Sequence, residues 1–246
     1  MRPLALLLAA LCLAPWAQAS WEDQIAAAGE SVAGAARLCG SPWVQIEAET
    51  DEDAALACQG FNRALRFMAE QGVAPKVPLR IVMAERFPER YQKYGVENMH
   101  GFYDTDTREV YIKSWRRFAQ TPAENTPLGV APSRELLVSY IAHEAGHHFS
   151  VQGYGAAPRL IPRAQGEYIS YSLQLATMEG GLREELMRRF RERGRGGFES
   201  VSEVSLTLHD MDPQGFAVKS YLFFTAPAGA AALRDMMAAQ VPDSGF

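Results

Sequence analysis

The chain has 246 residues, 48% of them hydrophobic and 22% charged, which is enough apolar material for a folded domain and argues against intrinsic disorder. The formal net charge of −5 shows no overall basic character, which argues against nucleic acid as a main partner. Basic residues gather locally at 182–195, but glutamates are interleaved among them, which favours a solvated helix surface over a membrane or nucleic-acid patch.

The first residues have the pattern of a secretory signal peptide. Arg2 precedes an apolar run over residues 4–15, and Ala17-Gln18-Ala19 is a typical cleavage signal. The run is too short to persist as a membrane-spanning helix. We therefore expect a signal peptide over residues 1–19, one mature domain over residues 20–246, no transmembrane segment after cleavage, and a periplasmic or secreted location.

The cysteines agree with export. Cys12 lies within the expected signal peptide, so the mature chain keeps Cys39 and Cys58. An even pair in an oxidising compartment predicts one intrachain disulfide, Cys39–Cys58. The alternative is a pair of buried free thiols.

The N-terminal half alternates helical and strand-like patterns. Residues 21–39 are Ala-rich and predict a helix, and residues 51–71 predict a second helix that Gly72 ends. A short apolar run predicts a strand at 77–84, and two short β-prone runs around Asp104-Thr105-Asp106-Thr107 predict a hairpin over 99–112.

The rest of the chain is expected to be mainly helical. A linker at 120–132 leads to a helix over 136–149, with Ser133 as its N-cap. Further helices are expected at 163–179, at 182–195, from Asp212-Pro213 to residue 224, and after Pro227. The sequence has no internal repeat and no strong domain linker.

The central helix carries the motif His143-Glu144-Ala145-Gly146-His147. Residues four apart lie only about 40° apart around a helix, so His143 and His147 project from one face and are placed to hold one zinc ion. Glu144 between them is the candidate general base, which takes a proton from zinc-activated water. His148 is about 140° from His143 around the helix, so we expect it to pack elsewhere.

A catalytic zinc site needs a third protein ligand. A histidine six residues after His147 would supply one, but that position holds Gly153. The other source is a carboxylate on the following helix, where Glu167 stands 20 residues beyond His147. Three other glutamates farther along are rivals, and a glutamate near a helix N-terminus is also favoured there simply by the helix dipole. The rivals are Glu179, Glu184 and Glu185.

The oxyanion formed by water attack needs a donor besides the metal. Side chains of suitable type after the zinc helices are His209, Tyr168, Tyr171 and Tyr221. His209 is the candidate proton donor, because it precedes Asp212-Pro213 in an expected loop that is able to return over the site. The alternative for His209 is an exposed loop residue.

These residues resemble the zincin metallopeptidases, specifically the gluzincin branch, in which two helices carry His-Glu-x-x-His and a downstream zinc-binding glutamate. The matching positions are His143, Glu144, His147 and Glu167, and the segment 166–171 resembles the Glu-Tyr opening of the second helix. The resemblance implies an α+β fold with a small, mostly antiparallel sheet packed on the motif helix and a mainly helical C-terminal part. Many gluzincins place an aspartate four residues after the third ligand, whereas this chain has Tyr171 there.

The expected function is that of an exported zinc metallopeptidase acting on a peptide or protein substrate. Two alternatives use the same residues. One is a non-catalytic zincin-like periplasmic binding protein with a structural or vestigial zinc site, and the other is a zinc-dependent hydrolase of cell-wall amides.

Overall fold

The structure is a computed structural model that describes residues 39–93, 95–126, 128–152, 161–192 and 196–238. The expected signal peptide lies outside the described residues. So do the expected helix at 21–39, apart from Cys39, and residues 153–160.

The N-terminal half builds a small sheet with short helices around it. Its elements, in chain order, are β1 (Val44–Ala48), α2 (Asp51–Glu70), β2 (Leu79–Ala84), α3 (Glu89–Gln92), η1 (Val96–Asn98), β3 (Gly101–Asp104), β4 (Glu109–Lys113), α4 (Trp115–Phe118) and η2 (Ala123–Asn125). The helix at 51–71, the strand at 77–84 and the hairpin at 99–112 are confirmed. Asp104 makes the hairpin turn, because its Oδ1 accepts hydrogen bonds from the backbone N–H groups of Asp106 and Thr107.

The sheet is mixed, and the expectation of a mostly antiparallel sheet is wrong. Its order is β1-β2-β4-β3, with β1 parallel to β2, β2 parallel to β4, and β3 antiparallel to β4. The difference comes from β1, which the sequence analysis did not predict although its residues alternate buried and exposed. Helix α2 carries the chain from the end of β1 back to the start of β2, and such a crossover produces a parallel pair.

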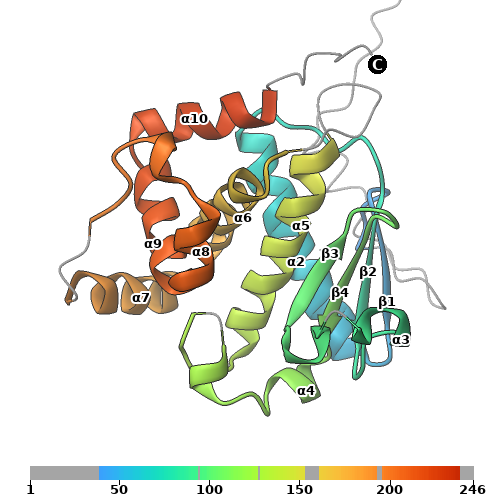
Figure 1. The fold of residues 1–246 in the computed structure, drawn as a ribbon. Coiled ribbons are helices and arrows are strands. Elements are labelled where there is room, and N and C mark those ends of the chain that lie inside the picture. The colour runs from blue at the N-terminus through green and yellow to red at the C-terminus, as the bar shows by residue number, and fades with distance from the viewer. Residues whose placement is uncertain (1–38, 94, 127, 153–160, 193–195, 239–246) are drawn as a thin grey trace, which may run out of the picture.

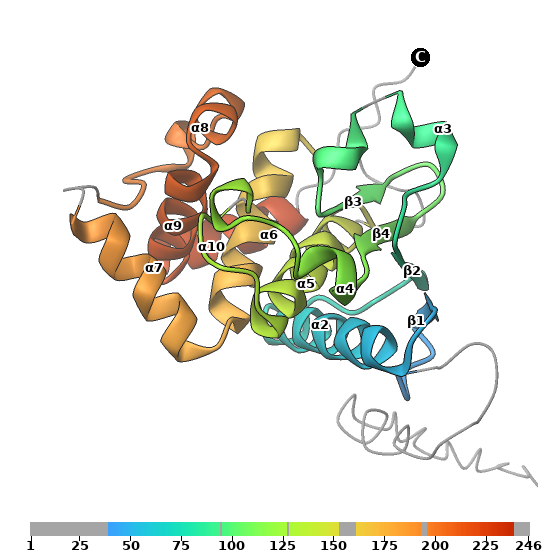
Figure 2. The same cartoon turned by 90° about the horizontal axis from the view of Figure 1, so that it is seen from below.

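The two faces of the sheet have different covers. Helices α2 and α5 pack on one face, whereas α3 stands on the opposite side (Figure 2). Beneath α3 a second, smaller apolar cluster gathers, formed by Val82, Phe87, Tyr91, Val96 and Tyr111. The small cluster covers part of the second face of β2 and β4, whereas alternate residues of β1 are exposed, and β3 is the edge nearest α5.

The C-terminal half is helical, as expected. Its elements are α5 (Arg134–Gln152), α6 (Arg163–Thr177), α7 (Gly180–Glu192), η3 (Val201–Glu203), α8 (Leu206–Met211), α9 (Pro213–Phe224) and α10 (Pro227–Ala238). The N-cap predictions are confirmed: Ser133 Oγ accepts from Leu136 N at 3.1 Å, and Asp212 Oδ1 accepts from Gly215 N at 3.0 Å. Figure 1 shows the sheet on one side of α2 and α5 and helices α6 to α10 on the other.

Helix α5 is held in the middle of the fold by close packing and by a half-buried ion pair. A Cβ atom at Gly60 of α2 would lie 2.5 Å from Cβ of Ile141, so only glycine allows this approach of α2 to α5. Arg63 of α2 donates to both carboxylate oxygens of Glu135 at 2.5 and 2.8 Å, and to the carbonyl of Thr177 at the end of α6. The arginine thus ties three helices together.

Cys39 and Cys58 form the expected disulfide, with their Cα atoms 5.2 Å apart. It joins the segment before β1 to the first half of α2. Among the described helices, none alone is long and apolar enough to cross a membrane, and α9 with α10 pass such a test only as a pair bent by 102°.

Candidate metal centre and active site

The two motif histidines meet on one face of α5, as their spacing predicts. Their Nε2 atoms are 3.2 Å apart, and their rings contact each other edge to face. His143 is buried and His147 is half-buried at the cleft wall. Two imidazole nitrogens therefore point to one place.

Glu167 reaches the same place from α6. Its Oε2 lies 3.5 Å from Nε2 of His143 and 3.6 Å from Nε2 of His147. His143, His147 and Glu167 are able to hold a metal ion together. Four ligands around zinc at bond lengths of about 2.0–2.2 Å lie roughly 3.3–3.6 Å from one another. The three observed spacings match that geometry before any adjustment of the side chains.

A glycine inside the motif allows α6 to come this close. A Cβ atom at Gly146 would lie 2.9 Å from Oγ and 3.1 Å from Cα of Ser170, which is tighter than ordinary packing permits. Ser170 is one turn beyond Glu167 on α6. The Gly146–Ser170 crossing therefore sets the distance at which Glu167 faces the histidines.

The pKa values of Glu167 and His147 suit cation binding, whereas that of His143 is shifted the other way. Burial raises the pKa of Glu167, but the bond from His143 and the charges of the nearby histidines outweigh it and lower that pKa to about 2. Burial lowers the pKa of His147 to about 4, so its ring is neutral and keeps a lone pair. For His143, burial lowers the pKa, but Glu167 and Glu144 outweigh it and raise it overall.

Glu144 lies beside the ligands and faces the edge strand. It is 8% exposed, and burial raises its pKa to about 7, with the charge of Glu167 adding to the rise and His143 opposing it. A Cβ atom at Gly101 of β3 would lie 3.5 Å from Cγ of Glu144 and clash with Ile112. The edge strand therefore approaches the glutamate closely because position 101 has no side chain.

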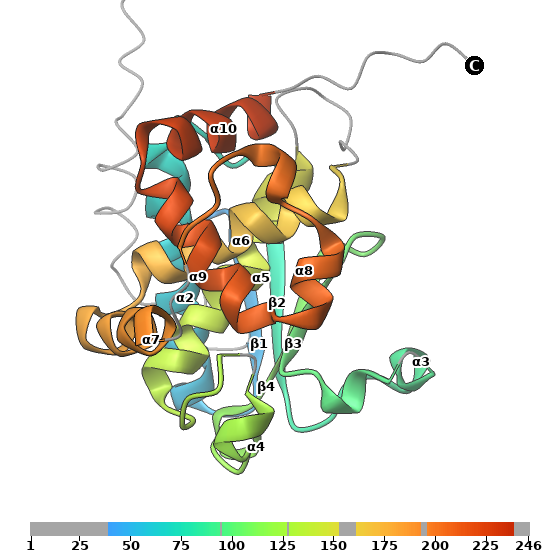
Figure 3. The same cartoon turned by 60° about the vertical axis from the view of Figure 1, so that its left-hand side comes forward.

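His209 joins the site from α8, a short helix where the sequence analysis expected a loop. Its Nε2 is 3.6 Å from Oε2 of Glu167, and its Nδ1 is 2.9 Å from Oδ1 of Asp210. Phe216 and Tyr171 contact the ring. Figure 3 shows α8 beside α9 on the same side of the fold as α6. The expectation that His209 lies at the site is met, and a helix holds it there.

Of the other candidate residues, one lies at the cleft and the rest do not line it. Tyr171 lines the cleft, but Tyr168 is buried away from it and donates to the carbonyl of Gly229. His148 also leaves the site, as expected: its Nε2 is 3.0 Å from the carbonyl of Val77, and its Nδ1 is 3.3 Å from the hydroxyl of Tyr103. The rivals to Glu167 lie elsewhere: Glu179 is bonded through its backbone to Glu135, and Glu185 pairs with Arg189.

Gln174 is a site residue that the sequence did not reveal. Its Nε2 donates to Ser139 Oγ at 3.1 Å, and Ser139 in turn donates to the carbonyl of Leu136 at 2.7 Å. The Oε1 of Gln174 and the Nδ1 of His143 are both buried with no well-aligned partner among the described residues. The two side chains are neighbours, because a hydrogen-bonding contribution from Gln174 helps to raise the pKa of His143.

The site opens into a cleft of about 720 Å³. One wall is the edge strand β3 with the residues on either side of it, and the other walls come from α5, α6 and α8. Arg163 stands at the mouth, with Nε 3.8 Å from Oε1 of Glu167. A candidate metal-binding triad, a buried carboxyl group and an edge strand thus line the same cleft.

No curated protein and no solved structure matches this chain. One family model does match, over residues 44–242, which include every described element from β1 to α10. The chain therefore belongs to the family of unknown function DUF6639.

Proposed function

We propose that this chain is an exported zinc-dependent metallopeptidase of the gluzincin type, which hydrolyses peptide bonds. The observation that carries the proposal is the convergence of His143, His147 and Glu167 at tetrahedral spacing beside the buried Glu144. Two imidazoles and one carboxylate are a typical donor set of catalytic zinc sites and leave a position open. When bound, zinc polarises the scissile carbonyl and lowers the pKa of the attacking water.

Glu144 acts as the general base. A pKa of about 7 makes a carboxylate that is basic enough to take a proton from the attacking water and acidic enough to release it. The water oxygen bonds to the carbonyl carbon, Glu144 takes the proton, and the C–N bond breaks as the proton passes to the leaving nitrogen. Glu144 lies close to β3, so this chemistry would act on a peptide that lies along the edge strand.

His209 is the proposed donor to the oxyanion. Asp210 holds its Nδ1, which orients the ring so that Nε2 faces the cleft. Tyr171 occupies the position where many gluzincins have an aspartate, and we propose that Gln174 replaces that aspartate. Ser139 Oγ donates to Leu136, so it must accept from Gln174 Nε2. Gln174 Oε1 is then left to accept Nδ1–H of His143, which leaves the Nε2 lone pair of His143 for the metal.

The proposed location is the periplasm or the exterior, after removal of residues 1–19. The Cys39–Cys58 disulfide supports this, because such bridges persist in oxidising compartments.

The test combines metal analysis with cleavage assays on the purified mature protein. We expect one zinc per chain, loss of zinc in His147→Ala and Glu167→Ala, and cleavage of peptides from a complex library. Glu144→Gln should keep zinc and lose at least about a thousandfold in turnover. His209→Gln should lower kcat with little change in KM, because an oxyanion donor acts mainly in the transition state.

The alternatives give different results. Stoichiometric zinc without turnover on peptides or peptidoglycan would contradict the proposal and indicate a non-catalytic binding protein. Cleavage of peptidoglycan but not of peptides would make the chain a cell-wall amide hydrolase. Full activity of Glu144→Gln would end the proposed mechanism.

A further inference from the structure

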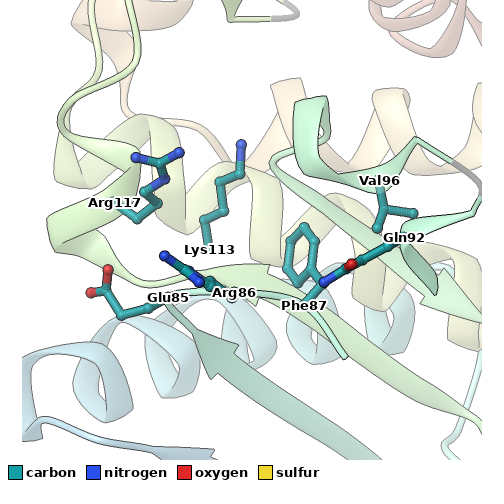
Figure 4. Close-up of a pocket in the computed structure, with 7 residues that line it drawn as sticks. All are labelled: Glu85, Arg86, Phe87, Gln92, Val96, Lys113 and Arg117. Atoms are coloured by element: carbon teal, nitrogen blue, oxygen red, sulfur yellow. The ribbon is translucent and has the colours of Figure 1, made fainter. Parts of the chain in front are cut away.

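A second hollow lies on the outer side of the sheet, beyond the metal cleft. Its cavity of about 460 Å³ has an apolar wall of Phe87 and Val96, and it carries the cations Arg86, Lys113 and Arg117 (Figure 4). The side chains of Lys113 and Arg117 extend in the same direction in this view. The hollow is therefore cationic on one side and apolar on the other.

A third hollow connects this pocket to the metal cleft. Its cavity of about 410 Å³ shares Lys113 and Arg117 with the cationic pocket, and it shares Asn98, His100 and Asn125 with the metal cleft. The backbone N–H of Lys113 donates to the carbonyl of His100, the residue before β3. The three hollows thus form one groove that runs from Glu144 past the start of the edge strand.

The cations in this groove have no carboxylate of their own. Among the described residues, none forms an ion pair with Arg86, Lys113 or Arg117. Glu85 lines the pocket, but its Oε1 accepts hydrogen bonds from Arg116 and Ser114, and these bonds, helped by the charge of Arg117, lower the pKa of its carboxyl group. Burial, with the charge of Arg117 adding to it, lowers the pKa of Lys113, so an arriving anion would relieve an unfavourable arrangement.

We propose that this groove is a substrate subsite that binds an acidic segment of the peptide, with a substrate carboxylate between Lys113 and Arg117. The inference deepens the proposed peptidase function and rests on it for the direction of the groove. Phe87 and Val96 would contact the apolar stem of the acidic residue, and Gln92 would supply an amide donor. The enzyme would then prefer peptides with glutamate or aspartate at a fixed distance from the scissile bond.

The features of the groove favour a peptide over a phosphate or a membrane surface. It continues from an edge strand whose free backbone groups pair with extended chains. The cations are spread along a wall that also offers apolar contacts. Such a wall suits the successive side chains of an extended peptide.

The test measures binding, so it needs no turnover. The probe is a short dye-labelled peptide of alternating glutamate and alanine, compared with its glutamine-alanine match by fluorescence anisotropy on zinc-loaded Glu144→Gln protein. We expect the acidic peptide to bind roughly three- to tenfold more tightly, with the preference falling at high salt. Adding Lys113→Gln and Arg117→Gln should abolish the preference while leaving Tm and zinc content unchanged.

Arg66→Gln is the matched control. It removes one positive charge, as each of the two groove substitutions does, from an exposed position of α2 that lines none of the three hollows, and it should keep the preference. Equal binding of the two peptides, or an undiminished preference in the double variant, would overturn the subsite. Competition by inorganic phosphate at concentrations where acetate has no effect would also overturn it and assign the pocket to phosphate. Preference without any peptidase activity would support the groove and refute only the proposed reaction.

Discussion

At the scale of single residues, burial lowers the pKa of two of the histidines on α5, His147 and His148. His148 is 1% exposed, and its Nε2–H donates to the carbonyl of Val77, so Nδ1 accepts from the Tyr103 hydroxyl. Burial lowers the pKa of His148 to about 4. This neutral ring ties the motif helix to β3 and to the segment before β2.

His148 should make the stability of the protein depend on pH. Its pKa is about 4 when folded and about 6.5 when unfolded, so between these values the unfolded chain binds more protons and stability rises with pH. From pH 6.5 down to 4.5 this one group should remove about 2–3 kcal/mol. Urea unfolding of metal-free protein should show that loss, and His148→Asn should show less of it. An identical pH dependence in the variant would contradict this assignment.

Gln174 should control zinc affinity through His143. Gln174→Leu removes the acceptor of Nδ1–H, and outer partners of this kind change metal affinity about 10- to 100-fold. Competition with a chromophoric chelator measures the dissociation constant. Gln174→Glu keeps an acceptor and should retain much of the affinity, and Ser172→Ala, two residues earlier on α6, should leave it unchanged. Wild-type affinity in Gln174→Leu would remove Gln174 from the site.

At the scale of elements, the site depends on how closely α6 crosses α5. The candidate ligands come from two separate helices, so their spacing is a property of helix packing as well as of side chains. Gly146 permits the crossing at Ser170, and Arg63 with Glu135 ties both helices to α2. The crossing therefore sets both the stability of the core and the geometry of the metal centre.

Substituting Gly146 should damage stability and zinc binding together. Gly146→Ala adds a methyl group 2.9 Å from Ser170 Oγ, and such overpacking costs about 1–3 kcal/mol. Thermal unfolding and zinc titration should both show the effect, with Gly146→Val worse. Gly181→Ala is the control, because a Cβ atom there meets nothing within 4 Å. A Gly146→Ala protein with wild-type Tm and zinc affinity would refute the argument.

At the scale of the whole molecule, the disulfide and the groove have separate roles. The disulfide helps to hold the layers together, and the groove is the proposed substrate-binding surface. The disulfide fastens the segment before β1 to α2, on which the sheet and α5 both pack. The groove from the metal centre to Arg86 runs past the start of the edge strand. Under the proposed function, stability and substrate binding depend on different parts of the fold.

Removing the disulfide should cost stability without affecting the metal centre. Cys39 and Cys58 are 19 residues apart, and closing a loop of that length restricts the unfolded chain by about 3 kcal/mol. Cys39→Ser with Cys58→Ser should lower the free energy of unfolding by about that amount in urea, and reductant should do the same to the wild type. Zinc affinity should not change. Equal stability with and without the bridge would contradict this expectation.

Much of the architecture followed from local patterns. The helical periods, the N-caps Ser133 and Asp212 and the turn at Asp104 involve contacts within a few residues, which the sequence displays directly. The pairing of His143 with His147 is of the same kind, because one helical turn sets it. Glu167 was also within reach, because it stands on the next helix at a suitable distance.

Features that join distant segments required the folded chain. The parallel pairing of β1 with β2, the approach of His209 and the contact between Gln174 and His143 each depend on how whole elements pack. In the sequence, Lys113 and Arg117 look like ordinary surface charges. They line a common groove only because the fold places β4 and α4 beside the metal cleft. Local periodicity reports the turn of a helix, but long-range proximity is set by the packing of the entire core, which leaves no short signature in the chain.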